Sequence, residues 1–418
     1  MSPTPSPRDL RLFYLFRLLS TSYLFVPVSI AYALSRGLGL GEVMALSSIY
    51  CLTVIVAEVP TGALADRLGR RPAMMAGALA MIAACGLFSV ATDFASFAAA
   101  EVLAALSLTL CSGADSAYLF DLVDGHKRGD EYARREGSSS AWHHGGSALA
   151  FAAGGFLGAQ DLVLPYLATG GVAALAFVVA LCMRPDAVRP VRTAFEPRAY
   201  LAHVRTTLRE VARRRSLVWT IACSALVFTL LRATTYIYQP FLDSAGFDVA
   251  GIGLVFAAVY LVSAVVSANT DALRRRFGES MLLGALLTAL VTTFLLLGST
   301  SLGRLGVAIL LLQAGANGLY SPLIKPLLNR EIIDSRRRAT ALSVESMARR
   351  AAFGLFSLAL GAVLELHSTE AGLLVCGLVG LAGSAVLLAT ARPARAGARD
   401  EDTAVPAPVH DHGSAPLA

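Results

Sequence analysis

The sequence predicts an all-α membrane protein with twelve transmembrane helices, arranged as two pseudo-symmetric six-helix halves. Two features of the 418-residue composition support this: 56% of the residues are hydrophobic and only 15% are charged, against about 25% charged in a typical soluble domain. The mean hydropathy of +0.62 points the same way. Because a spanning helix needs about 20 mainly apolar residues, the chain has room for many spans and does not fit a single soluble core.

Apolar segments recur along the chain with short polar connections. We expect spans near 11–34, 41–62, 72–91, 94–120, 137–159 and 161–183, then near 216–241, 249–272, 279–299, 303–326, 340–366 and 370–390. Residues 184–215 are rich in Arg and Pro and predict a cytoplasmic linker between an N-terminal half, 1–183, and a C-terminal half, 216–390. Residues 391–418 are rich in Ala, Pro and Asp, which predicts a disordered cytoplasmic tail.

The basic residues predict the orientation. Lys and Arg resist translocation and stay on the cytoplasmic side of a membrane. With both termini placed inside, 28 of the 35 Lys and Arg residues fall in inside segments and only Arg36 and Arg304 fall outside. This asymmetry requires an even number of spans and predicts a multi-pass protein of a bacterial cytoplasmic membrane with both termini in the cytoplasm.

Cysteine spacing and charge exclude several other classes of protein. The six cysteines lie within apolar segments without C-x-x-C spacing, so neither a disulfide framework nor a zinc site is expected. The net charge of +6 comes from basic residues in the connections, where topology explains them better than nucleic acid does. We therefore expect no metal, no cofactor and no nucleic-acid partner.

The two halves resemble each other in sequence. GADSAY begins at Gly113 and GANGLY at Gly315, an offset of 202 residues, and each is followed by a basic cluster before the next apolar segment. Arg17 with Pro27 and Arg232 with Pro240 form a looser echo in the first and seventh spans. Internal repeats around a central site are a common plan of secondary transporters.

The connection between the second and third spans reads GALADRLGRRP. It resembles the loop signature of the major facilitator superfamily, G-x-L-x-D-R-x-G-R-[RK], and matches every defining position. The resemblance implies a conformational latch whose basic residues meet an acid at the end of the fourth helix; a purely topological role for these charges is the alternative. The implied latch residues are Gly62, Asp66, Arg67, Gly69, Arg70, Arg71 and Asp121.

The residue types in this loop suggest how it is built. Gly62 should let two helices approach closely, Gly69 should permit a tight turn, and Asp66 should cap a helix or pair at the membrane surface. The sequence departs from the family pattern at two places. The fourth span has Glu101 and Asp115 but lacks the arginine that many members link to proton coupling, which weakens the inference of proton coupling. The fifth span has AFAAGG without the proline of many exporters, so the direction of transport stays open.

Ionisable groups within a span are costly and mark candidate sites. Arg17 and Glu58 lie at similar depths, where an ion pair or a gating role is plausible. Asp115 is the first choice for a protonatable or solute-facing group, with hydrogen-bonded packing as the alternative. Arg232, followed by Tyr236, Tyr238 and Gln239, could recognise a polar or anionic solute. The full set of substrate or proton-coupling candidates is Asp115, Glu58, Arg17, Glu101, His143, Arg232, Tyr236, Asn317 and Glu345.

The resemblance and the repeat together favour a secondary transporter that works by alternating access. No G-x-x-x-x-G-K-[ST] loop is present, so ATP drive is unsupported and protons are the expected coupling ion. We expect a monomer that exports a small amphipathic organic compound. Uptake of a metabolite is the alternative, followed by a non-transporting sensor and a membrane-embedded enzyme, for which the sequence offers no catalytic constellation.

Overall fold

A computed structural model describes most of the chain: residues 6–123, 129–185, 206, 209, 211–299, 303–331 and 338–390. The tail 391–418 and linker residues 186–205 lie outside the described residues, so the predictions for them stay predictions. Within the described ranges the regular structure consists of α-helices and short 3₁₀ helices without a strand, as the sequence predicts.

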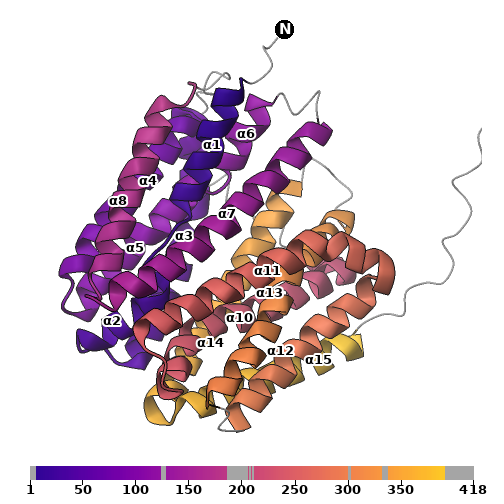
Figure 1. Ribbon diagram of the computed structural model, residues 1–418. Coiled ribbons are helices and arrows are strands. Elements are labelled where there is room, and N and C mark those ends of the chain that lie inside the picture. Colours follow the sequence, from indigo (N-terminus) through magenta and orange to yellow (C-terminus); the bar gives the residue numbers. More distant parts are fainter. Residues whose placement is uncertain are drawn as a thin grey trace, which may run out of the picture.

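The first half forms one bundle, drawn from indigo to magenta in Figure 1. Its elements are α1 (Pro7–Ser20), η1 (Val26–Val28), α2 (Ser29–Ser35), α3 (Leu40–Leu68), α4 (Arg70–Val90), α5 (Phe94–Cys111), α6 (Ala114–Leu122), α7 (Gly129–Gly158) and α8 (Leu164–Cys182). The first span consists of α1, η1 and α2, and the fourth of α5 and α6.

The second half forms a second bundle beside it, drawn from pink to yellow (Figure 1). Its elements are α10 (Arg215–Ser244), α11 (Val249–Phe277), α12 (Glu279–Ser299), η2 (Gly303–Leu305), α13 (Gly306–Glu331), α14 (Arg338–Leu366) and α15 (Thr369–Thr390). Ten helices of the described ranges are long and apolar enough to cross a membrane. The segmented first span and α7, whose first turns are polar, complete the expected twelve.

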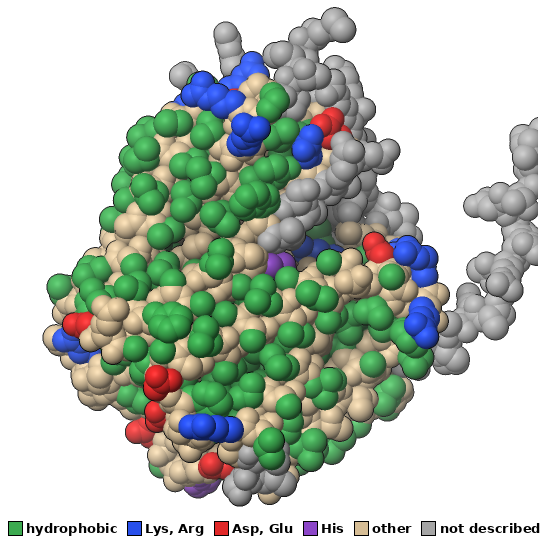
Figure 2. Space-filling view, viewed as in Figure 1, with side chains coloured by type: hydrophobic (Ala, Val, Ile, Leu, Met, Phe, Trp, Pro, Cys, Tyr) green, Lys and Arg blue, Asp and Glu red, His purple; other side chains and the backbone are tan. Residues whose placement is uncertain are grey.

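The outer surface has the character of a membrane protein. Figure 2 shows hydrophobic side chains across the broad face of both bundles, with charged groups toward the edges. Large aliphatic side chains are exposed on the surface. Among them are Leu149, Leu355 and Leu388, each more than 70% exposed. In water such a surface would be costly, whereas acyl chains solvate it.

The first span is interrupted near its middle. The sequence predicts one continuous helix over 11–34, and the interruption is a correction to that prediction. Pro27 has no N–H group and lies in the short 3₁₀ helix η1. Side chains satisfy the backbone groups that the break frees: the Thr21 hydroxyl donates to the Arg17 carbonyl at 2.6 Å, and the Leu24 N–H donates to Thr169 at 3.0 Å. The break is therefore a built feature of this helix.

The fourth span is interrupted at Gly113, whose φ of 83° favours glycine. The chain restarts there as α6, so Asp115 lies in the first turn of a new helix, where the helix dipole favours a negative charge. The GADSAY motif thus marks a helix start. In the second half GANGLY lies within the continuous helix α13, so the repeat diverges at this point.

Small residues bring the two halves into contact. A Cβ on Gly155 of α7 would lie 2.7 Å from the Gly253 Cα of α11, so these two helices meet backbone to backbone. Likewise, a Cβ on Gly361 of α14 would lie 2.8 Å from the Met44 Cβ of α3. Close approach through small residues is a standard way to associate helices in lipid.

Polar contacts close the space between the halves at the end that holds the starts of α3 and α11, here called the far end. The carboxylate of Glu365 on α14 accepts a hydrogen bond from the Gly41 N–H in the first turn of α3 at 2.9 Å. The amide of Gln239 donates to the Val26 carbonyl at 2.8 Å and accepts from the Ile30 N–H at 3.0 Å. Gln239 thus joins the two halves through backbone groups of the first span.

Candidate functional site

A cavity of about 310 Å³ lies between the two halves and is called the central cavity below. Spans 1, 2, 3, 4, 5 and 6 of the first half contribute to its wall, and α10, α11 and α14 contribute from the second. Its lining residues include Phe25, Tyr50, Cys51, Phe88, Phe97, Glu101, His143, Tyr166, Phe228, Arg232, Tyr236, Tyr260 and Arg350. A cavity of this size at an interface between two bundles is typical of a small-molecule site.

Aromatic rings form one wall of the central cavity. Phe25, freed from α1 by the break, stacks on Tyr166 of α8 with ring centroids 4.8 Å apart and planes 5° apart. Phe88 of α4 packs against the same Tyr166 ring at 5.2 Å. Such a wall offers a rigid apolar surface for a flat or hydrophobic part of a solute.

Charged and polar groups face the same cavity from other sides. Glu101 of α5, His143 of α7 and Arg232 of α10 all line it. These three described residues form no ion pair with one another at 4 Å or less. The Arg232 guanidinium instead lies 5.7 Å from the Tyr236 ring centroid, a cation–π contact. The cavity wall therefore holds an acidic and a basic side chain that are not paired with each other.

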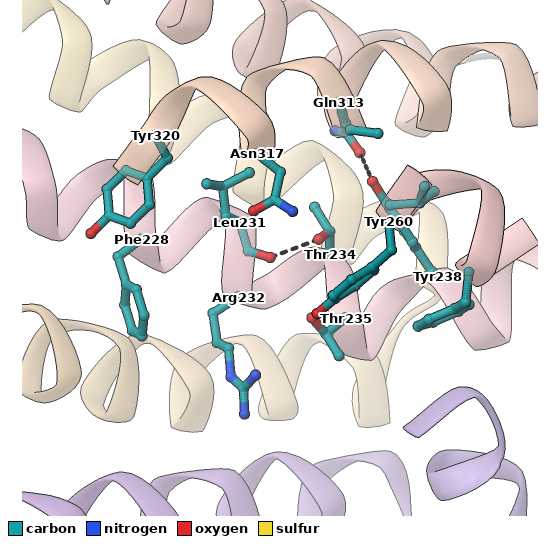
Figure 3. A pocket seen from close by; sticks show the side chains of 13 residues that line it. Phe228, Leu231, Arg232, Thr234, Thr235, Tyr238, Tyr260, Gln313, Asn317 and Tyr320 are labelled. Carbon is teal, nitrogen blue, oxygen red and sulfur yellow. Dashed lines mark hydrogen bonds between the residues drawn. The ribbon is translucent and has the colours of Figure 1, made fainter. Parts of the chain in front are cut away.

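A second, smaller cavity of about 190 Å³, the side pocket, lies inside the second half among α10, α11 and α13 (Figure 3). It shares four wall residues with the central cavity. In Figure 3 the Arg232 side chain extends from α10 toward the first half, away from Gln313 and Asn317 of α13. The lining residues are Phe228, Leu231, Arg232, Thr234, Thr235, Tyr238, Phe256, Val259, Tyr260, Gln313, Ala314, Asn317 and Tyr320.

Asn317, expected as the neutral counterpart of Asp115, thus lies in a pocket wall, and its amide donates to Ser263 at 3.1 Å. Asp115 itself is buried and forms an ion pair with Arg17. Of the two alternatives for Arg17 and Glu58, the ion pair between them is not formed: Glu58 instead accepts a 3.4 Å hydrogen bond from Ser346 of the other half. Neither cavity is lined by Arg17, Asp115 or Glu58.

The Arg17–Asp115 pair belongs to a polar cluster in the first half. Glu136 of α7 lies 4.0 Å from Arg17 and accepts a hydrogen bond from Ser116 at 3.1 Å. This cluster joins the first, fourth and fifth spans. Its members compensate one another's charges in a region that would otherwise penalise them.

A matching cluster joins the first, fourth and fifth spans of the second half. Glu345, which is buried, accepts a hydrogen bond from Ser224 and lies 3.6 Å from Arg349. The hydroxyls of Ser224 and Tyr320 are 2.9 Å apart. Glu345 and its repeat partner His143 therefore have different surroundings, because His143 faces the central cavity.

The signature segment Gly62–Arg71, here called the loop, runs through the end of α3, Gly69 and the first turn of α4, and it ties three helix ends together. Arg70 contacts both the Asp121 carboxylate and the Ala117 carbonyl of α6, the latter at 2.6 Å. Arg71 donates to the Ala180 and Leu181 carbonyls at the end of α8 at 2.8 and 2.6 Å. Cations at helix C-termini satisfy open carbonyl groups and complement the helix dipole.

Two glycines of this loop differ in role. Gly69 has φ of 102° and separates α3 from α4, which agrees with the expected tight turn. A Cβ on Gly62 would meet nothing within 4 Å, so the expected close helix approach at Gly62 is wrong for this conformation. Asp66 is exposed.

Several residues of the site escaped the sequence analysis. Gln313 lies in the tenth span and Glu136 in the fifth. A polar or charged residue within an apolar span is itself a signal, and it could have identified both. The aromatic wall carried no such signal, because Phe25, Phe88 and Tyr166 resemble ordinary membrane-helix residues until the helices are placed together.

Two six-helix bundles of membrane-spanning helices that enclose a cavity with both apolar and charged walls define the class of membrane solute transporters. Comparison with known proteins identifies the family. The sequence profile described as Major Facilitator Superfamily matches residues 12–332, and the chain belongs to this superfamily. It is a transporter and not an enzyme.

Among curated proteins, the tetracycline resistance protein of class C from Escherichia coli is 27% identical over 303 residues, 70% of this chain and 72% of that protein. The class G protein from Vibrio anguillarum is 26% identical over 313 residues, covering 73% and 77%. Both relatives are tetracycline resistance proteins.

Solved structures show the same fold at lower sequence identity. The nucleoside transporter NupG matches with a TM-score of 0.73 and 13% identity over 92% of this chain and 98% of that one. A D-xylose–proton symporter matches with a TM-score of 0.65 and 15% identity over 90% and 96%.

Proposed function

We propose that the chain is a proton-coupled exporter of a small amphipathic organic compound, working by alternating access in a bacterial cytoplasmic membrane as a monomer with both termini in the cytoplasm. The observation that carries this is the central cavity, where an aromatic wall faces Glu101 and Arg232 without an ion pair between them. The names of the two resistance proteins support export.

Glu101 supplies a physical route to exchange. A solute that donates a hydrogen bond or carries positive charge binds the ionised carboxylate, and a proton at the same carboxylate removes that acceptor. The two ligands then compete, so that entry of the proton on one side promotes release of the solute. Asp115 is less suited to this role, since Arg17 already compensates its charge.

The loop Gly62–Arg71 with Asp121 remains a latch in this proposal. Arg70 and Arg71 fasten the loop to α6 and α8 of the same half, so the loop would move with the first half as a rigid unit. Its Asp66 and Arg67 are then carried toward or away from the second half as the halves rock.

Purified protein in proteoliposomes tests the function. An imposed proton gradient should drive tetracycline, the first probe, against its concentration gradient and opposite to the proton. The Glu101→Gln variant, which imitates the protonated carboxyl, should lose gradient-driven flux and bind the solute more weakly, while Asp115→Asn, folded, should keep its gradient dependence. Movement of solute together with protons would instead establish uptake, and chemical turnover of a screened compound without flux would refute transport.

A further inference from the structure

The side pocket contains a buried hydrogen-bond donor that the protein leaves unpaired. Gln313 is 1% exposed, and its amide oxygen accepts from the Tyr238 hydroxyl at 2.7 Å (Figure 3). The Gln313 amide nitrogen has no hydrogen-bond partner. Buried polar groups are almost always paired, so an orphan donor on a pocket wall points to a ligand.

The pocket's shape and walls restrict that ligand. Five aromatic side chains line it: Phe228, Tyr238, Phe256, Tyr260 and Tyr320. Its volume of about 190 Å³ exceeds the roughly 150 Å³ of a protein cavity known to hold benzene. A single flat ring with one polar substituent therefore fits, whereas a molecule of several rings does not.

Its position links it to transport. Phe228, Arg232, Thr235 and Tyr260 line both cavities, so one end of a solute in the central cavity lies beside the side pocket. Charge also restricts the ligand at the junction of the two cavities, because Arg232 lies on the wall that they share. A positively charged group that reaches this shared wall would meet like charge.

We propose that the side pocket is a second ligand chamber, which takes a planar group bearing an oxygen acceptor and binds that oxygen with the Gln313 amide N–H. The proposal deepens the proposed function, on which it rests: the transported compound carries a carbonyl or carboxylate on a ring at one end. The side pocket binds this end, and the aromatic wall of the central cavity holds the other.

Ligand-observed NMR titration of the full chain in nanodiscs tests this with benzamide, which carries a carbonyl, and benzylamine, which is cationic and has no oxygen. Wild-type protein should bind benzamide saturably and at least about tenfold more tightly than benzylamine, a difference of about 1.4 kcal/mol. Equal binding of the two probes, or no saturable binding of benzamide, would overturn the proposal.

Variants locate the binding. Gln313→Met keeps the side-chain length and removes the donor; Gln313→Leu, which is shorter, also removes it. Both should weaken benzamide binding about tenfold or more. The matched control is Thr229→Val, which removes another buried, unpartnered group on α10 outside the pocket wall and should leave the affinity unchanged. Wild-type affinity in both folded Gln313 variants would refute the assignment.

This test is separate from the flux measurement. Selective benzamide binding without proton-driven flux would support the proposed ligand chamber and refute proton-coupled export. Flux without selective benzamide binding would support export and refute the ligand chamber. If neither Gln313 variant folds, the comparison of the two probes on wild-type protein decides.

Discussion

Arg17 and Asp115 place opposite charges inside the first half, where neither could stand alone. Their side chains are 18% and 9% exposed. Removing one partner of a buried pair leaves an uncompensated charge, whereas replacing both with neutral groups restores the balance. Glu136, 4.0 Å from Arg17, provides part of the compensation.

A double-mutant cycle measures this coupling. We expect Asp115→Asn to destabilise the protein by about 3–5 kcal/mol and Arg17→Gln by a similar amount. The double variant should cost less than the sum of the two, because neither charge remains unpaired. Thermal unfolding in detergent gives the three values, and additive losses would show that the two side chains do not interact.

The sequence could predict which residues are charged inside the membrane, but not their partners. The similar depths of Arg17 and Glu58 along two unbroken helices left an ion pair between them and a gating role as equal alternatives. The pairing with Asp115 depends on the break at Gly113, which starts a new helix and turns Asp115 toward Arg17. Rotation and tilt of helices decide such contacts, and periodicity in a nearly uniformly apolar helix carries little information about either.

At the scale of elements, the glycines of α7 and α11 determine how closely the halves approach. In the sequence, Gly154 and Gly155 end AFAAGG, an incomplete form of a motif of many exporters. A Cβ on Gly155 would lie 3.0 Å from the Val249 carbonyl oxygen as well as 2.7 Å from the Gly253 Cα. Backbone atoms cannot move aside as a flexible side chain can.

We therefore expect Gly155→Val to separate α7 from α11, to cost about 1–3 kcal/mol of stability through overpacking, and to reduce flux. Gly171→Val is the matched control, since a Cβ at this exposed position of α8 meets nothing within 4 Å. Unfolding midpoints and proteoliposome flux report both effects. Equal behaviour of the two variants would contradict tight packing at Gly155.

The predicted spans agree with the observed helices within several residues, because the length of an apolar segment directly reflects membrane thickness. The interruptions at Thr21–Phe25 and at Gly113 were not predicted. Pro27 and Gly113 were visible in the sequence, yet both residue types also occur in continuous membrane helices: Pro240 lies inside α10, and Gly315 lies inside α13.

The whole molecule is two bundles that meet through α3 with α14 and α7 with α11. Glu365 and Gln239 close the far end, whereas the loop with Arg70 and Arg71 lies at the opposite end, bound within the first half. Alternating access requires the far-end contacts to break while the halves approach each other at the opposite end, here called the loop end. The central cavity lies between the two ends and stays between the halves as they rock.

Distances between spin labels on the two halves test this rocking most directly. Exposed Asp161 and His367 report the far end, and exposed Leu68 and Arg276 report the loop end; each pair is replaced by cysteines in a protein whose exposed Cys182 is serine. On adding solute or raising the proton concentration, the far-end distance should increase while the loop-end distance decreases. Two distances that stay constant, or that change in the same direction, would contradict alternating access by rocking halves.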